Sequence, residues 1–163
     1  MATQIEERFV DMHPGSAARH QKAAAIFPDG VTHESRRQRP FQLYYTHAEG
    51  SHKYDIDGNK LIDYWSGHGS LILGHSHPAI VEAVGNQMAK GTHLSGSTDL
   101  EINWANQVID LIPSAEKVRF HSSGTEATMM AIRMARAYTG KNKIVKFQNH
   151  FHGWSDYLVA GND

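Results

Sequence analysis

Small polar residues flank a glycine in the stretch Ser122-Ser123-Gly124-Thr125, between a β-rich run and a strongly helical run of this chain. The backbone N–H groups of such a loop and of the first helical turn lack intrahelical acceptors and favour a negatively charged ligand. Gly124 lets the main chain approach that ligand closely. The sequence therefore predicts that Ser123, Gly124 and Thr125 bind a phosphate group.

A second polar loop, residues 149–154, carries the aromatic ring of Phe151 and two imidazoles. It follows a strand-like run at 143–147, as the first loop follows one at 117–120, and a helix is predicted between the two runs. The parallel strands of such a βαβ unit place both loops at the same edge of a sheet. An anion site beside an aromatic surface suits a planar phosphorylated cofactor, and pyridoxal 5'-phosphate fits this description.

Turn residues and hydrophobic spacing predict the elements that precede these loops. Two short helices are expected in residues 4–26, interrupted by Pro14-Gly15, and a strand is expected at 43–45. The turn sequence Asp57-Gly58-Asn59 predicts a hairpin that pairs 53–56 with 61–64.

Three longer helices are predicted further along the chain. They run from Pro78 to about Lys90, from Thr98 to Pro113 and from Thr125 to Gly140. The third helix should pack against a sheet through a stripe of small and apolar residues, namely Ala127, Ala131, Met134, Ala135 and Tyr138.

Composition excludes several classes of function. With 16 Lys and Arg against 17 Asp and Glu, the net charge of −1 provides no basic field for nucleic acid or a membrane surface. The absence of cysteine excludes disulfides, thiolate catalysis and thiol metal sites. No stretch approaches membrane-spanning length and the first residues lack a secretory signal, so we expect a cytoplasmic protein.

Several spaced motifs resemble class III aminotransferases, including the aminomutases among them. They are Asp57-Gly58-Asn59, the run from Leu71 to Pro78, Ser123-Gly124-Thr125-Glu126-Ala127, the run from Lys143 to Phe147, and Phe151-His152-Gly153. The resemblance covers the chain from about Phe27 onward. It implies a pyridoxal-phosphate enzyme of fold type I, with an α/β major domain of three αβα layers whose first, incomplete part is residues 67–163. Residues 1–66 would be the N-terminal segment and hairpin of the smaller domain.

The resemblance also implies roles for individual residues in cofactor binding. Ser123, Gly124 and Thr125 would hold the cofactor phosphate, and Phe151 would stack on the pyridine ring. His152 and Gly153 would shape the same loop.

On the substrate side, the resemblance places Arg36 where an arginine receives a carboxylate, a task that its planar fork suits. His68 stands where the aminomutases have a tryptophan, and residues 32–35 also differ from theirs. A transaminase acting on another amino acid, such as a β- or aromatic one, therefore fits at least as well as an aminomutase.

The lysine that holds the cofactor covalently in this family, and the acidic residue that keeps the pyridine nitrogen protonated, match no position of this chain. We therefore expect the chain to be the N-terminal part of such an enzyme and to be inactive alone. The partners implied are a small amino donor and acceptor, a second copy in a homodimer, and a complementary C-terminal part.

Two other functions are compatible with parts of the sequence. The first loop could serve a noncatalytic phosphate-ligand or assembly module, because Ser and Thr are also ordinary helix caps. The 12 histidines include the pairs His75/His77 and His150/His152, and histidines two apart on a strand can share a metal. Arg36, within a cluster of arginines, could equally be a solvated surface charge.

Overall fold

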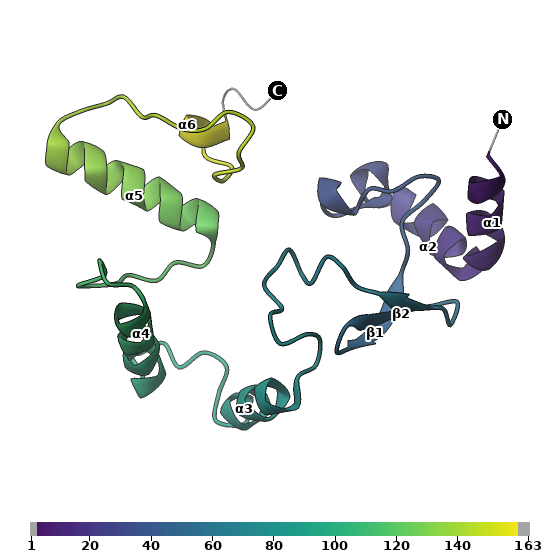
Figure 1. Cartoon of the computed structure of the whole chain (residues 1–163), viewed down its shortest axis with the longest axis horizontal. Coiled ribbons are helices and arrows are strands. Elements are labelled where there is room, and N and C mark those ends of the chain that lie inside the picture. Colours follow the sequence, from purple (N-terminus) through teal and green to yellow (C-terminus); the bar gives the residue numbers. More distant parts are fainter. Residues whose placement is uncertain (1–2, 160–163) are drawn as a thin grey trace. The chain divides into compact units, whose positions relative to one another are not determined.

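The computed structural model describes residues 3–159 of the chain. It contains two compact units, Met1–Leu94 and Ser95–Asp163, each described by itself below (Figure 1). The domain boundary expected after residue 66 separates the small and major domains of a complete enzyme, and it stays a prediction. Within residues 3–159, no helix combines the length and apolar character needed to cross a membrane.

The N-terminal unit begins with two short helices, as predicted. Helix α1 (Gln4–Met12) starts at a capping box, in which Thr3 and Glu6 each accept a hydrogen bond from the other's backbone N–H. His13, with φ −131° and ψ 47°, breaks the helical path. Helix α2 (Pro14–Ala24) then begins with Pro14 at its first position, where proline needs no hydrogen-bond donor.

A three-stranded antiparallel sheet follows, in the order β1 (Tyr45–Glu49), β2 (His52–Asp55) and β3 (Lys60–Ile62). The hairpin predicted around Asp57-Gly58-Asn59 joins β2 to β3, and Gly58 adopts the positive φ of +86° that the turn needs. The strand expected at 43–45 begins only at Tyr45.

Two 3-10 turns, η1 (Pro28–Gly30) and η2 (Glu34–Arg36), connect α2 to the sheet. Phe41 follows them and is buried, with its ring centroid 5.1 Å from that of Phe9 in α1. This aromatic contact holds the first helix against the segment that leads into the sheet. Helix α3 (Pro78–Met88) follows the sheet, and Gly91 comes shortly after its end.

The C-terminal unit contains the two other predicted long helices. Helix α4 (Asp99–Leu111) starts at a capping box formed by Thr98 and Glu101. Helix α5 (Gly124–Thr139) ends at Gly140, which adopts the left-handed conformation with φ +67°. A short helix, α6 (Asp156–Val159), closes the described chain.

The two strands predicted in this unit are not formed. Among residues 3–159, neither 117–120 nor 143–147 is a strand, and no backbone hydrogen bond joins these two segments. A strand exists only as part of a hydrogen-bonded ladder, and neither segment has a neighbouring strand here. Val145, with 98% of its surface exposed, illustrates the result.

The stripe on α5 is likewise not buried, contrary to the prediction. Met134 is 61% exposed and Tyr138 is 93% exposed. A stripe at helical spacing shows which face can pack, but burial requires an opposing surface, and a sheet is what this stripe would need.

Candidate functional site

Ser123 caps helix α5 and thereby fixes the first predicted loop. Its Oγ accepts a hydrogen bond from the Glu126 N–H at 3.1 Å and lies 3.1 Å from the Glu126 carboxylate, to which it donates. The Ser123 carbonyl accepts from the Ala127 N–H at 3.0 Å. Within residues 3–159, no group accepts a hydrogen bond from the N–H groups of Gly124 and Thr125, so two donors of the first turn are available to an anion.

The space above these donors is open. A Cβ atom added to Gly124 would have no heavy atom within 4 Å beyond its chain neighbours and its own helix backbone. Gly124 also lacks the positive φ that would explain a glycine by backbone conformation alone. The position therefore has the clearance that a phosphate group needs in order to approach the main chain.

The second predicted loop packs directly on this first turn. The Trp154 N–H donates to Thr125 Oγ1 at 3.3 Å, and Thr128 Oγ1 lies 3.0 Å from the carbonyl oxygen of His152. Gly153, with φ +109°, makes this approach possible, because a Cβ there would lie 3.0 Å from both Cα and Oγ1 of Thr125. The structure thus brings Ser123, Gly124 and Thr125 together with His152 and Gly153, and their roles in cofactor binding stay a prediction.

Phe151 presents its ring to the surface of the same loop. Its side chain is 66% exposed and meets Trp154 edge to face, with the ring centroids 5.4 Å apart. His152 Nε2 and Ser155 Oγ are buried and have no hydrogen-bond partner among residues 3–159. The loop that packs on the first turn of α5 therefore offers an exposed aromatic ring, that of Phe151.

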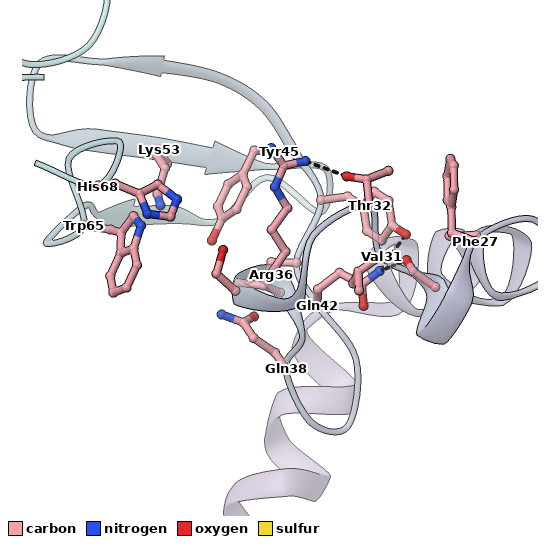
Figure 2. A pocket seen from close by; sticks show the side chains of 15 residues that line it. Phe27, Val31, Thr32, Arg36, Gln38, Gln42, Tyr45, Lys53, Trp65 and His68 are labelled. Carbon is pink, nitrogen blue, oxygen red and sulfur yellow. Dashed lines mark hydrogen bonds between the residues drawn. The ribbon is translucent and has the colours of Figure 1, made fainter. Parts of the chain in front are cut away.

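Arg36 and His68, the two predicted substrate residues, line one pocket in the N-terminal unit (Figure 2). We call it the Arg36 pocket; it has a volume of about 640 Å³ and is lined by Ala23, Phe27, Gly30, Val31, Thr32, Ser35, Arg36, Gln38, Gln42, Leu43, Tyr44, Tyr45, Lys53, Trp65 and His68. Turn η2 presents Arg36, whose Nη1 donates to Thr32 Oγ1 at 3.1 Å.

Arg36 differs from its neighbour Arg37 in its charge environment. Arg37 lies 3.4 Å from the carboxylate of Asp29. Among the described residues, no carboxylate forms an ion pair with Arg36. An arginine that faces a pocket without an internal counterion can bind a carboxylate from outside.

Three aromatic and charged lining residues were missed in the sequence. Lys53 Nζ lies 4.7 Å from the ring centroid of Tyr45, and Trp65 meets His68 edge to face at 5.2 Å. Tyr45 and Lys53 look like ordinary strand residues until turns η1 and η2 are placed beside the sheet. Trp65 could have been found, because it directly precedes the glycine-flanked loop that carries His68.

Asp63 neutralises Lys53. Its buried carboxylate accepts from Lys53 Nζ at 3.0 Å, from His75 Nε2 at 2.7 Å and from the Trp65 N–H at 3.0 Å. Burial alone would raise the pKa of Asp63, but these hydrogen bonds and the Lys53 charge outweigh burial and hold the pKa well below its usual range. Asp63 is therefore ionised and provides the counterion for Lys53.

One group of potential metal ligands occurs among residues 3–159, at His13, Asp55 and Asp57. Asp55 already accepts hydrogen bonds from His13 Nδ1 at 2.8 Å and from the Asn59 N–H at 2.7 Å. Burial would raise the pKa of Asp55, but the hydrogen bonds from Asn59, His13 and Asp57 lower it. These interactions tie α1 to the hairpin turn.

Asp57 has an equally clear structural partner. It caps α2 by accepting from the N–H groups of Gly15 at 2.6 Å and Ser16 at 3.1 Å. In the histidine pair His75/His77 noted in the sequence, the His75 ring is hydrogen-bonded to the Asp63 carboxylate.

Comparison with known proteins shows the family of the chain. The family described as "Aminotransferase class-III" matches residues 33–163. A glutamate-1-semialdehyde 2,1-aminomutase from Methanopyrus kandleri is 47% identical over 152 residues, which make up 93% of this chain and 35% of that enzyme. A second, from Rhodopirellula baltica, is 44% identical over 150 residues, or 90% of this chain and 34% of that one.

Solved structures show the same relationship in the backbone. An omega-transaminase from Sphaerobacter thermophilus matches with a TM-score of 0.87 at 38% identity, covering 92% of this chain and 35% of that one. A β-phenylalanine aminotransferase from Variovorax paradoxus matches with a TM-score of 0.89 at 32% identity, covering 96% and 38%. The chain spans about a third of the length of the relatives that it matches.

Proposed function

Because the chain belongs to the class III aminotransferase family, we propose that it forms the N-terminal part of a pyridoxal-phosphate-dependent aminotransferase or aminomutase. In this proposal its two sites bind the cofactor's phosphate and ring, and the substrate's carboxylate. The observation that carries it is the packing of residues 151–154 on the first turn of α5, beside the free N–H groups of Gly124 and Thr125.

These residues fit the cofactor chemically. The Gly124 and Thr125 N–H groups would donate to the phosphate, and the exposed ring of Phe151 would cover one face of the pyridine. When bound, pyridoxal phosphate supplies the electron sink for reactions at the carbon that bears the amino group. His152 and Gly153 would act through the backbone by holding Phe151 beside α5.

The Arg36 pocket would hold the substrate. The guanidinium of Arg36 has no carboxylate partner within the described chain and would bind the substrate's carboxylate. His68 lines the same pocket. Fixing the carboxylate orients the amino group, which is how a binding residue assists a reaction that it does not itself perform.

The remaining parts of the enzyme follow as further elements of the proposal. The lysine that attaches the cofactor and its acidic partner would come from a complementary C-terminal part. The 117–120 and 143–147 segments would then become strands of a three-layer sheet, in a homodimeric, cytoplasmic enzyme.

Cofactor binding can be tested with 4-deoxypyridoxine 5'-phosphate, which keeps the ring and phosphate but has no aldehyde to react with lysines. The whole 163-residue chain is titrated while backbone amide signals are followed by NMR. We expect the signals of Gly124, Thr125 and Phe151 to shift together. Gly124→Ala, which fills the open space, should weaken binding by about 10-fold or more, equivalent to about 1.4 kcal/mol.

Gly85→Ala in α3 is the matched control, because a Cβ there also meets nothing within 4 Å. Equal binding by Gly124→Ala and wild type would refute the proposed phosphate site. Equal affinity for inorganic phosphate and the pyridine phosphate would instead favour the noncatalytic phosphate-ligand module over the enzyme.

A further inference from the structure

We infer that the Arg36 pocket is specific for amino acids with one carboxylate and an aromatic or similarly large apolar side group, and that it discriminates against dicarboxylates. This inference rests on the proposed function and goes beyond it by naming the substrate class. Three features of the pocket carry it: its count of free cations, the geometry of Arg36 and its aromatic lining.

The pocket contains one permanent cation without a counterion. Of its two permanently charged lining residues, Lys53 is paired with the buried Asp63 at 3.0 Å. Arg36 has no such partner among residues 3–159. A second substrate carboxylate would meet only Lys53, whose charge is already balanced by Asp63 at 3.0 Å, and would therefore gain much less than the first carboxylate gains at Arg36.

The contact of Arg36 with Thr32 selects which edge of the guanidinium is free. Nη1 donates to Thr32 Oγ1, and within residues 3–159 neither Nε nor Nη2 of Arg36 has a hydrogen-bond acceptor. These two nitrogens form the side-on edge that can donate two parallel hydrogen bonds to one carboxylate. Thr32 therefore positions Arg36 for a single bidentate carboxylate.

Aromatic surface supplies the rest of the binding site. Figure 2 shows Tyr45 and Trp65 on one side of Arg36, and these side chains are 44% and 59% exposed. The polar lining residue Gln42 is already committed, since its amide donates to the Gly30 carbonyl at 2.7 Å and to the Tyr44 hydroxyl at 2.9 Å. An apolar substrate group gains by covering the two rings.

The inference is tested by comparing three simple carboxylates on the whole chain: 3-phenylpropanoate, pentanoate and glutarate. Binding is followed through the indole N–H signal of Trp65 and the arginine Nε–H signals in NMR spectra. We expect 3-phenylpropanoate to bind more tightly than glutarate by about 10-fold or more, and pentanoate to lie between them.

Two variants separate the carboxylate contact from general charge. Arg36→Gln should weaken 3-phenylpropanoate by about 10-fold or more, whereas Arg37→Gln, which removes the neighbouring arginine paired with Asp29, should leave it unchanged. Trp65→Ala should abolish the preference for phenylpropanoate over pentanoate while pentanoate still binds. Amide spectra of each variant establish that the N-terminal unit is folded.

Glutarate binding as tightly as 3-phenylpropanoate, or equal losses in the two arginine variants, would overturn the inference. A titration with 4-deoxypyridoxine 5'-phosphate in the same samples keeps the two proposals apart. If that ligand binds at Gly124 while the carboxylates show no Arg36-dependent preference, the inference alone fails. If the carboxylates behave as expected but the cofactor analogue does not bind, the pocket assignment stands and the proposed function fails.

Discussion

Substituting Gly153 by alanine should detach the 149–154 loop from helix α5. At φ +109° an alanine backbone is strained, and residues held in such sparsely populated conformations cost about 1–3 kcal/mol. The new Cβ would also lie 3.0 Å from Thr125 Cα. That atom belongs to the helix backbone and cannot rotate away, so this overpacking adds about 1–3 kcal/mol.

The polar contacts between the loop and the helix together contribute about 1–3 kcal/mol, against a combined cost of about 2–6 kcal/mol. They include two hydrogen bonds, from the Trp154 N–H to Thr125 Oγ1 and between Thr128 Oγ1 and the His152 carbonyl. Each contributes about 0.5–1.5 kcal/mol net. The loop should therefore lift from the helix. A ligand that needs Phe151 beside α5 must then bring the loop back, and its binding free energy is reduced by at least the cost of the strained backbone.

The expected result is weaker binding of 4-deoxypyridoxine 5'-phosphate, by about 5- to 150-fold for a penalty of about 1–3 kcal/mol. The amide signals of Thr125 and Thr128 should shift at the same time. Gly69→Ala provides the control, since Gly69 has a comparable φ of +84° but a Cβ there meets nothing within 4 Å. If Gly153→Ala leaves both the Thr125 signals and the affinity within about twofold of wild type, the close-packing argument is refuted.

Three other outcomes are expected. Asp57→Ala removes the acceptor for the Gly15 and Ser16 N–H groups and should lower the free energy of unfolding of the N-terminal unit by about 0.5–2 kcal/mol in urea, with no change counting against the cap. The pKa values of Asp55 and Asp63 lie below their unfolded value of about 3.9, so their stabilisation is complete above that pH and is lost as pH falls further. Urea unfolding from about pH 6 to about pH 2 should show this loss, and Asp63→Asn should flatten it; a pH-independent wild type would contradict the assignment. Borohydride reduction of the chain mixed with pyridoxal phosphate should label no single lysine stoichiometrically by peptide mapping, and one such lysine would show that the chain carries its own attachment site.

Local signals in the sequence predicted the elements that depend on local interactions. The hairpin at Asp57-Gly58-Asn59 and the end of α5 at Gly140 are both set by residues that accept positive φ. The start of α4 is set by the reciprocal hydrogen bonds of Thr98 and Glu101. Such features need no distant partner and are confirmed.

Features that depend on a distant surface were not predictable. The run 143–147 contains the β-branched and aromatic residues typical of a strand, but a strand needs a neighbour, and Val145 and Phe147 are exposed here. The same reason applies to the exposed stripe on α5. The two candidate sites also differ in how far they depend on distant contacts. The loop at Gly153 packs on Thr125 although the strands of the predicted βαβ unit are not formed, because Gly153 permits the close approach. The contribution of Tyr45 and Lys53 to the Arg36 pocket depends on turns that fold beside the sheet.

The Asp57 cap has a kinetic consequence. Its carboxylate lies 42 residues along the chain from Gly15, yet it satisfies the first turn of α2. We therefore expect the capped form of α2 to appear only after the intervening chain has closed and the hairpin turn has formed. The stability of this local helix thus depends on a non-local contact. In pulse-labelling hydrogen exchange during refolding, the α2 amides should gain protection together with the β2–β3 hairpin rather than ahead of it.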